Sequence, residues 1–543
     1  MKKILRSAVA LLAAAGVAAG CMSAAGNQKT AGNQETAGNQ ETAGNQETAT
    51  PESGETSARE DAPGGDGGQE RASRETEEAG EKESSGGEIR ETDTLMQGGQ
   101  GEEGIKNEEL KVDGLMNIES AVEAVYPDMA SYPDEEEYFD KKTGEFDSDR
   151  FSEAYNAWWS DKQARRNLPE GCADSLTPFF KSSIRQFLTE KTDGEDENRI
   201  YSPINVYMAL SMLAETTDGD SRHQILSLLR AGSLEELRLQ AGRIWNASYS
   251  QDGAVTSLLA NSLWLDQDIA FKEEILESLA KHYYASSYWG QMGTEELDEQ
   301  LQNWLNQQTG GLLKQQASGL HMADDTLVAL ASTIYFRAKW SNEFLKSSTE
   351  EGVFHGPEGD ITCEFMGQSG TDTYYWGEKF GAVSKSFQES GSMWLILPDE
   401  GVTPEEVLMG DEVMELFLGR RDGKNQKRLI VNLSMPKFDV VSNIDLKEGL
   451  SRLGVADVFD GSKADFTPLA EETEGVFVSQ ASHAARVMVD EEGCIAAAYT
   501  VMAAAGGAMP PEEQMDFILD RPFIFVITSD SGLPLFAGIV KQP

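Results

Sequence analysis

The spacing of apolar residues divides the chain into regions of different character. An apolar run near the N-terminus, Ala8 to Ala19, is followed by polar sequence without an apolar period until about residue 109. Aromatic residues then return, and from Cys172 to the C-terminus apolar positions recur at helical or strand spacing. Because a buried face needs such recurrence, residues 172–543 are predicted to form the globular domain, preceded by an extension, residues 109–171.

Within the globular region the pattern predicts helices first and strands later. Leu176 to Leu188 has helical spacing, and the apolar segment after Pro203 is typical of a buried helix. Short apolar runs predict strands at Ala260–Leu265, Thr326–Tyr335, Met393–Leu397, Leu429–Leu433, Pro522–Ile527 and Leu533–Val540. The lengths of Thr326–Tyr335, Met393–Leu397 and Leu429–Leu433 suit strands buried on both faces. This order predicts an α+β fold in which helices pack on large sheets.

The extension carries one amphipathic segment. Phe151, Tyr155 and Trp158 fall at positions i, i+4 and i+7, and the segment ends in the basic stretch Lys162–Arg166. A small binding module and a helix docked on the main domain both fit this pattern. Roughly sixty residues can bury only a thin core of their own, which favours docking.

The apolar run at the N-terminus has the pattern of an export signal. Basic residues precede it, and it is too short to remain as a bilayer-spanning anchor. It ends in Ala18-Ala19-Gly20-Cys21, which resembles the bacterial lipobox, although Ala18 stands where leucine is usual. Residues 1–21 are therefore predicted to be a lipoprotein signal peptide with Cys21 as the lipidation site. Plain secretion is the alternative.

Residues 22–108 lack any apolar face. The hexapeptide Ala-Gly-Asn-Gln-Glu-Thr recurs at Ala31–Thr36, Ala37–Thr42 and Ala43–Thr48, and Gly-, Ser- and Glu-rich sequence follows it. Such sequence is predicted to be a disordered tether with a reach on the order of 50 Å. The whole chain carries a formal net charge of −48, so nucleic acid is not expected as a partner.

The sequence contains no complete catalytic or metal-binding motif. Gly367-Gln368-Ser369-Gly370 begins like a nucleophile elbow but continues with Thr371, and no His-Glu-x-x-His pair is present. Apart from Cys21, the cysteines are Cys172, Cys363 and Cys494, an odd number without metal-ligand spacing. We therefore expect no enzyme, no catalytic residues, no metal and no cofactor, and at least one free thiol.

Short motifs recur in a fixed order through the globular region. They are Asn198 with Ser202-Pro203, Trp304 with Thr309 and Gly311, Ile334-Tyr335-Phe336 with Lys339-Trp340, Leu395-Ile396-Leu397-Pro398, Met435-Pro436-Lys437-Phe438, Leu453-Gly454, Ala464-Asp465-Phe466, Glu491-Glu492-Gly493 and Arg521-Pro522-Phe523. In this order and spacing, residues 172–543 resemble the serpin family. The resemblance implies a large central sheet, smaller sheets, about eight or nine helices and an exposed reactive loop.

The same resemblance implies a suicide inhibitor of serine proteases that acts as a monomer. In the family, a protease cuts the exposed loop, whose N-terminal half then inserts into the main sheet as a new strand and distorts the trapped protease. A non-inhibitory serpin that serves as a surface binding or structural protein is the alternative.

The loop stretch, Glu491 to Pro511, fits more than one local structure by composition. Its alanines and methionines favour a helix, whereas alternate positions from Cys494 to Ala504 are uniformly small, as a strand in a crowded sheet requires; an exposed loop also fits. The resemblance implies a hinge made of Glu491, Glu492, Gly493, Cys494, Ala496, Ala497 and Ala498. The chain departs from the inhibitory pattern at Cys494, Ile495 and Tyr499.

A shutter, over which the strands of the main sheet part, is also implied. Its residues align with Ser202, Asn205, Ser332 and His483. Asn205 stands where serine is usual, and Ser332 where asparagine is usual. The two changes are either a coupled exchange that keeps the hydrogen bonds or two unrelated substitutions.

A breach, the point where the loop enters the sheet, aligns with Trp340, Lys437 and Glu491. Lys437 and Glu491 are expected to form a partly exposed ion pair worth about 0–1 kcal/mol. For Trp340, ordinary core packing is the alternative.

The loop also predicts the target. Counting from Glu491 as in the family places the scissile bond at Gly507–Ala508, with Ala505 and Gly506 also in range. These side chains are small, and the loop from Gly493 to Pro511 has no Lys or Arg, which excludes a protease that requires a cation. We expect an extracellular, elastase-like serine protease as the partner, with subtilisin-like proteases second, at the extracellular face of the bacterial cell membrane.

Overall fold

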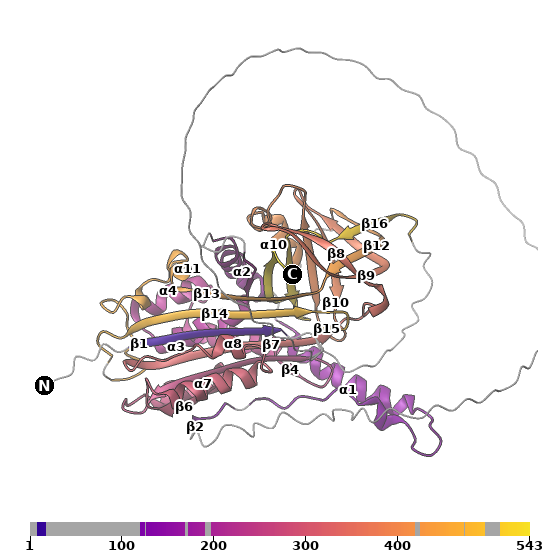
Figure 1. Cartoon of the computed structure of the whole chain (residues 1–543). Coiled ribbons are helices and arrows are strands. Elements are labelled where there is room, and N and C mark those ends of the chain that lie inside the picture. The colour runs from indigo at the N-terminus through magenta and orange to yellow at the C-terminus, as the bar shows by residue number, and fades with distance from the viewer. Residues whose placement is uncertain are drawn as a thin grey trace, which may run out of the picture. The chain divides into compact units, whose positions relative to one another are not determined.

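In the computed structural model (Figure 1), the described residues are 8–17, 120–124, 126–168, 172–190, 197–418, 424–471, 473–494 and 511–543. The predicted tether, residues 22–108, and the loop residues 495–510 lie outside these ranges. No helix within the described ranges is both long and apolar enough to cross a bilayer.

Two sheets form the framework of the described chain. The first sheet has the order β13 (Phe438–Asp445), β14 (Phe477–Val489), β1 (Ala8–Val17), β7 (Thr326–Lys339), β5 (Thr256–Asp266), β6 (Ala285–Gly290) and β2 (Ser120–Val122), with β15 (Gly493–Cys494) on β7 and β4 (Ser250–Gln251) on β5. The second has the order β16 (Gln514–Ile518), β12 (Gln426–Pro436), β9 (Gly359–Trp376), β10 (Phe380–Ser386), β11 (Ser392–Pro398), β17 (Phe523–Thr528), β18 (Pro534–Val540) and β3 (Arg199–Tyr201), with β8 (Thr349–Gly356) on β9.

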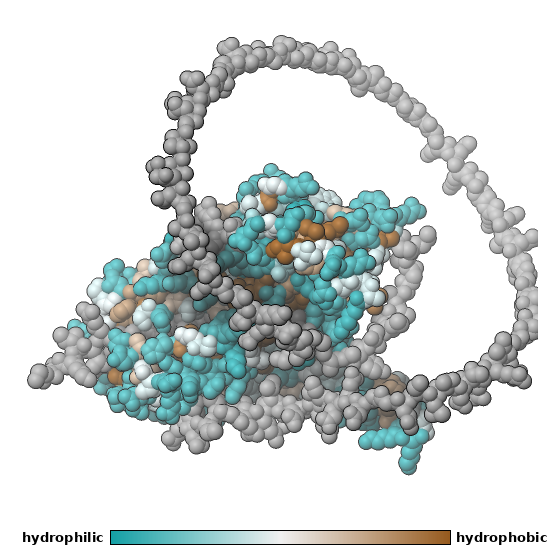
Figure 2. Space-filling view, viewed as in Figure 1, coloured by the Kyte–Doolittle hydropathy of each residue, from teal (hydrophilic) through white to brown (hydrophobic). Residues whose placement is uncertain are grey.

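Helices surround both sheets. The α-helices of the described chain are α1 (Ser148–Arg166), α2 (Cys172–Thr189), α3 (Pro203–Thr216), α4 (Gly219–Leu229), α5 (Leu234–Ser248), α6 (Glu273–His282), α7 (Glu295–Gln308), α8 (Lys314–Ala317), α9 (Pro404–Leu408), α10 (Asp411–Phe417) and α11 (Lys447–Arg452). Short 3-10 helices lie at Glu135–Tyr138, Lys346–Ser348 and Asp457–Phe459. On the face seen in Figure 2, hydrophilic residues predominate and apolar ones are scattered.

The α+β class is confirmed, and the structure adds two details. Eleven α-helices lie within the described ranges, ten of them in residues 172–543, where about eight or nine were expected. The smaller sheets are one continuous nine-stranded sheet, because the 18-residue β9 pairs with β8 and β12 along most of its length and with β10 near its end.

The central strands β5 and β7 are buried on both faces, as the apolar run Thr326–Tyr335 predicted for β7. Along β5, Leu263 faces the large core that contains α3, while its neighbour Trp264 faces the smaller core that contains α7. Helix α3 is itself buried at every position. It begins at Pro203, with the Ser202 hydroxyl accepting a hydrogen bond from the backbone N–H of Asn205. The helix thereby places its N-terminus beneath the first sheet.

Strand β1 occupies the gap between β7 and β14. It runs parallel to both neighbours, with Ala13 opposite Ser332 on one side and His483 on the other. A segment that follows β14 must reverse direction to enter this gap, so the loop would run opposite to β1. Residues 8–17 belong to the predicted signal peptide, which stays a prediction. In this structure residues 8–17 therefore fill the gap as a strand.

Removal of residues 1–20 should lower the thermal stability of the protein. Because β1 pairs along both edges, a chain that begins at Cys21 should unfold at least about 5 °C below the full chain, measured by circular dichroism at one scan rate. The full-length variant Ala13→Pro, which removes a donor and disturbs both ladders, should behave like the shortened chain. Equal midpoints for all three proteins would contradict this role of β1.

Candidate functional site

The implied site residues gather along the gap between β7 and β14. The shutter lies where the N-terminus of α3 meets the two strands, and the breach lies at the end of β7, where the chain leaves β14. The two clusters thus mark the middle and the entrance of one slot. This slot is the candidate functional site.

The structure brings all four shutter residues together. Ser202, Asn205, Ser332 and His483 are fully buried. The backbone N–H of Ser202 donates to Nε2 of His483 on β14, at 3.0 Å, and the side-chain amide of Asn205 donates to the hydroxyl of Ser332 on β7, also at 3.0 Å. The start of α3 is therefore hydrogen-bonded to both strands that border the gap.

The contact between Asn205 and Ser332 favours the coupled exchange over two unrelated substitutions. The amide that the family places on the strand here comes from the helix, and the hydroxyl comes from the strand, so one donor and one acceptor still meet. The ring of Tyr201 packs edge-on against His483, with centroids 5.5 Å apart. A buried network of this kind is disturbed when any one strand moves.

At the breach, Glu491 is the hub of a small polar cluster. Its Oε1 lies 2.8 Å from Nζ of Lys437 and accepts a hydrogen bond of 2.8 Å from the hydroxyl of Thr349, while Lys437 also pairs with Glu364 at 3.1 Å. The expectation of a partly exposed pair is wrong for Glu491, whose side chain is only 8% exposed, against 30% for Lys437.

Burial of Glu491 makes its partners important. Burial acts to raise the pKa of this carboxyl, but the hydrogen bonds from Lys437 and Thr349 outweigh it and hold the pKa below its ordinary value. Removal of Lys437 would leave a buried charge with less compensation, which is more damaging than the loss of a surface pair. The cluster therefore fixes the base of the loop to β8 and β9.

Trp340 is both core and part of the breach. Its ring stacks on Phe387 with centroids 4.7 Å apart, and its indole N–H donates to the carbonyl oxygen of Asp490 at 3.0 Å. The buried ammonium of Lys385 lies 5.3 Å from the centroid of the Trp340 ring, and burial lowers the pKa of Lys385 to about 7. Trp340 thus links the end of β14 to the second sheet.

The third residue of the hinge is a glycine that no other residue can replace without strain. Gly493 has φ = 126°, and a Cβ atom there would lie 2.7 Å from the carbonyl oxygen of Ala338 and from the N atom of Trp340. Gly493 and Cys494 pair antiparallel with Lys339 and Ala338 at the end of β7. The first two loop residues therefore already lie at the entrance of the gap.

Asp490, which the sequence did not single out, organises the turn before the hinge. Its Oδ1 accepts hydrogen bonds from the backbone N–H groups of Glu492 at 3.0 Å and Gly493 at 3.3 Å. Burial, opposed in part by these bonds, raises the pKa of Asp490 to about 6. A carboxyl directly before Glu491 in the sequence was the one local signal for it.

Other implied residues cannot be placed in the same way. The side chain of Cys494 and residues Ala496, Ala497, Ala498, Gly507, Ala508 and Cys21 lie outside the description, as does the side chain of Cys172. Cys363, on β9, is a free thiol. Thr349 and Glu364 belong to the breach but come from strands distant in sequence, so no local pattern pointed to them.

The chain is similar to known proteins over the region that contains both clusters. A family model described as serpin (serine protease inhibitor) matches residues 180–543. Serpin-ZX from Arabidopsis thaliana is 28% identical over 374 residues, which span 65% of this chain and 94% of that protein. The leukocyte elastase inhibitor of Homo sapiens is 29% identical over 369 residues, which span 66% of this chain and 96% of that protein.

Solved structures agree on the fold. The native state of tengpin, a thermophilic serpin, superposes with a TM-score of 0.60 at 24% identity, covering 69% of this chain and 95% of that one. The native stressed conformation of Arabidopsis AtSerpin1 also gives 0.60 at 24% identity, covering 69% of this chain and 100% of that one. The serpin fold is therefore confirmed for the region that contains both clusters.

The shutter exchange predicts a coupled pair of reversions. Asn205→Ser or Ser332→Asn alone removes the amide–hydroxyl contact and should lower the free energy of unfolding by about 1–2 kcal/mol. The double variant restores a hydroxyl–amide pair in the opposite sense and should recover at least half of the summed loss, measured by urea denaturation. Strictly additive losses would show that the two substitutions are unrelated.

The raised pKa of Asp490 predicts a pH-dependent contribution to stability. The folded state holds this proton more tightly than the unfolded chain, so the native protein gains stability as pH falls through about 6. Asp490→Asn removes the charge but keeps the acceptor. Because the site is partly solvated, the variant should be only ~1 kcal/mol more stable than the native protein near pH 7.5, with the difference shrinking below pH 6 and vanishing only below the ordinary aspartate pKa of about 3.8. The free energy of unfolding of both proteins is measured by denaturant at each pH. If the two values changed with pH in parallel, a raised pKa of Asp490 would be contradicted.

Proposed function

The chain belongs to the serpin family, and on that premise we propose that it is a suicide-substrate inhibitor of serine proteases. The observation that carries the proposal is the pairing of Gly493 and Cys494 with the end of β7. Because these first residues already pair at the entrance of the gap, the rest of the loop can enter the gap while this backbone pairing is kept. Its function is inhibition rather than catalysis.

Insertion supplies the free energy for the proposed mechanism. Once the acyl-enzyme forms, the cut loop enters between β7 and β14, antiparallel to β14, and each new backbone hydrogen bond contributes about 1 kcal/mol. The protease remains covalently attached and is carried with the loop. The ten-residue strand β1 supports this step, since it pairs with both neighbours in the same gap.

The shutter and breach assign separate tasks to the residues around the gap. The hydrogen bonds from α3 to Ser332 and His483 hold the two strands in defined positions until the loop arrives. The Glu491–Lys437 pair keeps the loop base attached to the second sheet while the remainder moves. Only the residues after Gly493 then need to change conformation.

The small residues around Gly507–Ala508 suggest an elastase-like target, with subtilisin-like proteases second. A protease with a shallow or blocked specificity pocket accepts such side chains, whereas a trypsin-like protease requires a cation that this loop lacks. Similarity to the human leukocyte elastase inhibitor, at 29% identity, supports this choice. A non-inhibitory serpin remains the alternative, although the bulky Ile495 and Tyr499 would face outward on insertion by strand parity and be tolerated.

The proposal also covers where in the cell the protein acts. The Ala18–Cys21 pattern supports lipidation at Cys21 and attachment to the extracellular face of a bacterial membrane, with plain secretion as the alternative. The polar stretch 22–108 would then let the inhibitor act at a distance from the bilayer. Its target would be an extracellular protease that approaches the cell.

The loop chemistry predicts which protease is trapped. Mixed with an elastase-like protease, a chain that begins at Cys21, in which β1 no longer fills the gap, should form a detergent-stable complex on a denaturing gel, and with trypsin it should not. Ala498→Arg places a large cation on the face of the loop that turns inward by strand parity, so it should convert inhibition into plain loop cleavage. Ala497→Arg, on the opposite face, is the matched control and should still inhibit. Cleavage without complex by the native protein would favour the non-inhibitory alternative.

A further inference from the structure

The N-terminal extension packs against the serpin body although it lies outside the matched region. The family model begins at residue 180, whereas the described extension comprises residues 120–124 and 126–166. Strand β2 pairs antiparallel with β6 at the edge of the first sheet. Helix α1 follows and contacts α5, and its Trp158 is only 1% exposed. The extension is therefore part of the folded body.

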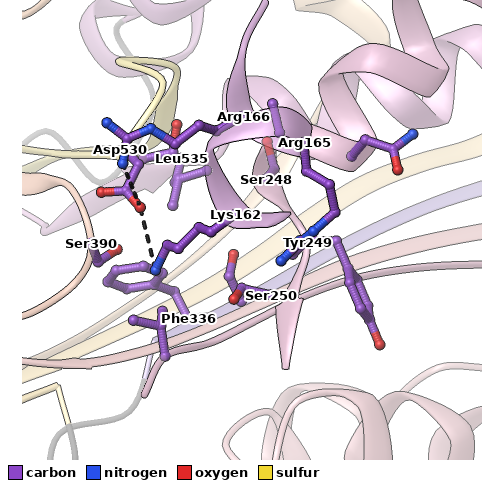
Figure 3. A pocket seen from close by; sticks show the side chains of 15 residues that line it. Lys162, Arg165, Arg166, Ser248, Tyr249, Ser250, Phe336, Ser390, Asp530 and Leu535 are labelled. Atoms are coloured by element: carbon purple, nitrogen blue, oxygen red, sulfur yellow. Dashed lines mark hydrogen bonds and ion pairs between the residues drawn. The ribbon is translucent and has the colours of Figure 1, made fainter. Parts of the chain in front are cut away.

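Lys162 is the central contact of this interface. Its side chain is 7% exposed, and Nζ lies 3.7 Å from a carboxylate oxygen of Asp252 and 3.5 Å from one of Asp530. Nζ also donates a hydrogen bond to the carbonyl oxygen of Glu389. In Figure 3 the Lys162 side chain points away from α1 and toward Asp530. One buried cation thus meets three separate turns of the body.

Those turns belong to both sheets. Asp252 lies in the turn between β4 and β5 of the first sheet, whereas Glu389 and Asp530 lie in the β10–β11 and β17–β18 turns of the second. Neighbouring residues of α1 repeat the same contacts. The indole N–H of Trp158 donates to Asp252 at 3.0 Å, and the hydroxyl of Tyr155 donates to Glu389 at 3.2 Å. Helix α1 therefore fastens one sheet to the other.

The acidic groups depend on this cation. Burial raises the pKa values of Glu389 and Asp530, and the positive charge of Lys162 opposes the rise in each case. Arg166 adds a second contact to Asp530, at 3.5 Å. If the helix left, these buried carboxylates would lose their compensating charge, so undocking is opposed by electrostatics as well as by loss of apolar packing.

The opposite side of the β10–β11 turn holds the entrance of the gap. The backbone N–H of Gln388 donates to the carbonyl oxygen of Lys339 at 2.7 Å, and Phe387 stacks on Trp340. Trp340 in turn donates to Asp490 at the base of the loop. One short turn, residues 387–391, thus contacts α1 on one side and the breach on the other.

We propose that the extension, residues 120–124 and 126–166, is a regulatory latch which, through Lys162, holds the β10–β11 turn against the end of β7 and restrains movement of the breach, which lies beyond Phe336, the last β7 residue paired with β1. The inference deepens the proposed function, because the breach that it restrains is the point where the loop enters. Undocking of the extension loosens the breach and makes insertion easier.

Hydrogen–deuterium exchange on the full chain tests the latch without any protease. Lys162→Met keeps most of the apolar part of the side chain but removes the ammonium group, and it should speed exchange on the order of tenfold in residues 338–344, 387–391 and 490–493. Lys142→Met changes an exposed lysine of the same extension and is the matched control, with no expected effect. Faster exchange confined to residues 120–166 would overturn the proposal.

A second variant approaches the same contact from the body. Asp530→Asn removes the pairing with Lys162 and Arg166 at nearly constant shape, so it should speed exchange in the same segments. In the double variant, Asp530→Asn should increase the exchange rate by less than it does alone, because the two substitutions remove one shared contact. Full additivity would count against the latch.

Inhibition assays then connect the latch to function. With an elastase-like protease and chains that begin at Cys21, Lys162→Met should lower the number of inhibitor molecules consumed per trapped protease, because a looser breach favours insertion over release of the cleaved loop. An unchanged number alongside faster exchange would overturn the regulatory role. If the native protein traps no protease, the proposed function fails, while the exchange results still decide whether the extension restrains the breach.

Discussion

The contact between the N-terminus of α3 and two strands that do not pair with each other is the constraint on which the rest of the structure depends. Ser202 reaches His483 on β14, and Asn205 reaches Ser332 on β7, all in a fully buried setting. Because buried polar groups must keep their partners, the separation of the strands and the integrity of this network are linked. The gap is thus a defined feature of the fold.

The gap between β7 and β14 can accept the loop, and the charged residues at its entrance hold the base of the loop in a fixed position. Glu491 is buried and held by Lys437 and Thr349, so the chain up to Gly493 has its position before any protease arrives. Gly493 then permits a conformation that a Cβ atom would forbid. The division between a fixed base and a movable remainder lets the free energy of strand insertion act on whatever is attached to the loop's far end.

The sequence predicted those features that leave a local signal. The buried helix after Pro203 and the central strand around Ser332 follow from apolar periodicity, and the shutter and breach residues follow from the resemblance. Helices α8 to α11, of four to seven residues, are too short for a period to show, so the apolar pattern did not predict them. Thr349, Glu364 and the partners of Lys162 come from distant strands and turns. The apolar run 8–17 predicted an export signal, and nothing local predicted its pairing with β7 and β14.

The most direct measurement of the central claim is the thermal stability of the protein before and after a single cut in the loop between Gly493 and Pro511, in a chain that begins at Cys21. If the cut loop inserts into the gap, it adds a strand paired on both edges, and the unfolding midpoint should rise by at least about 10 °C. A midpoint that is unchanged or lower after cleavage would mean that the gap does not accept the loop, and the account would be contradicted.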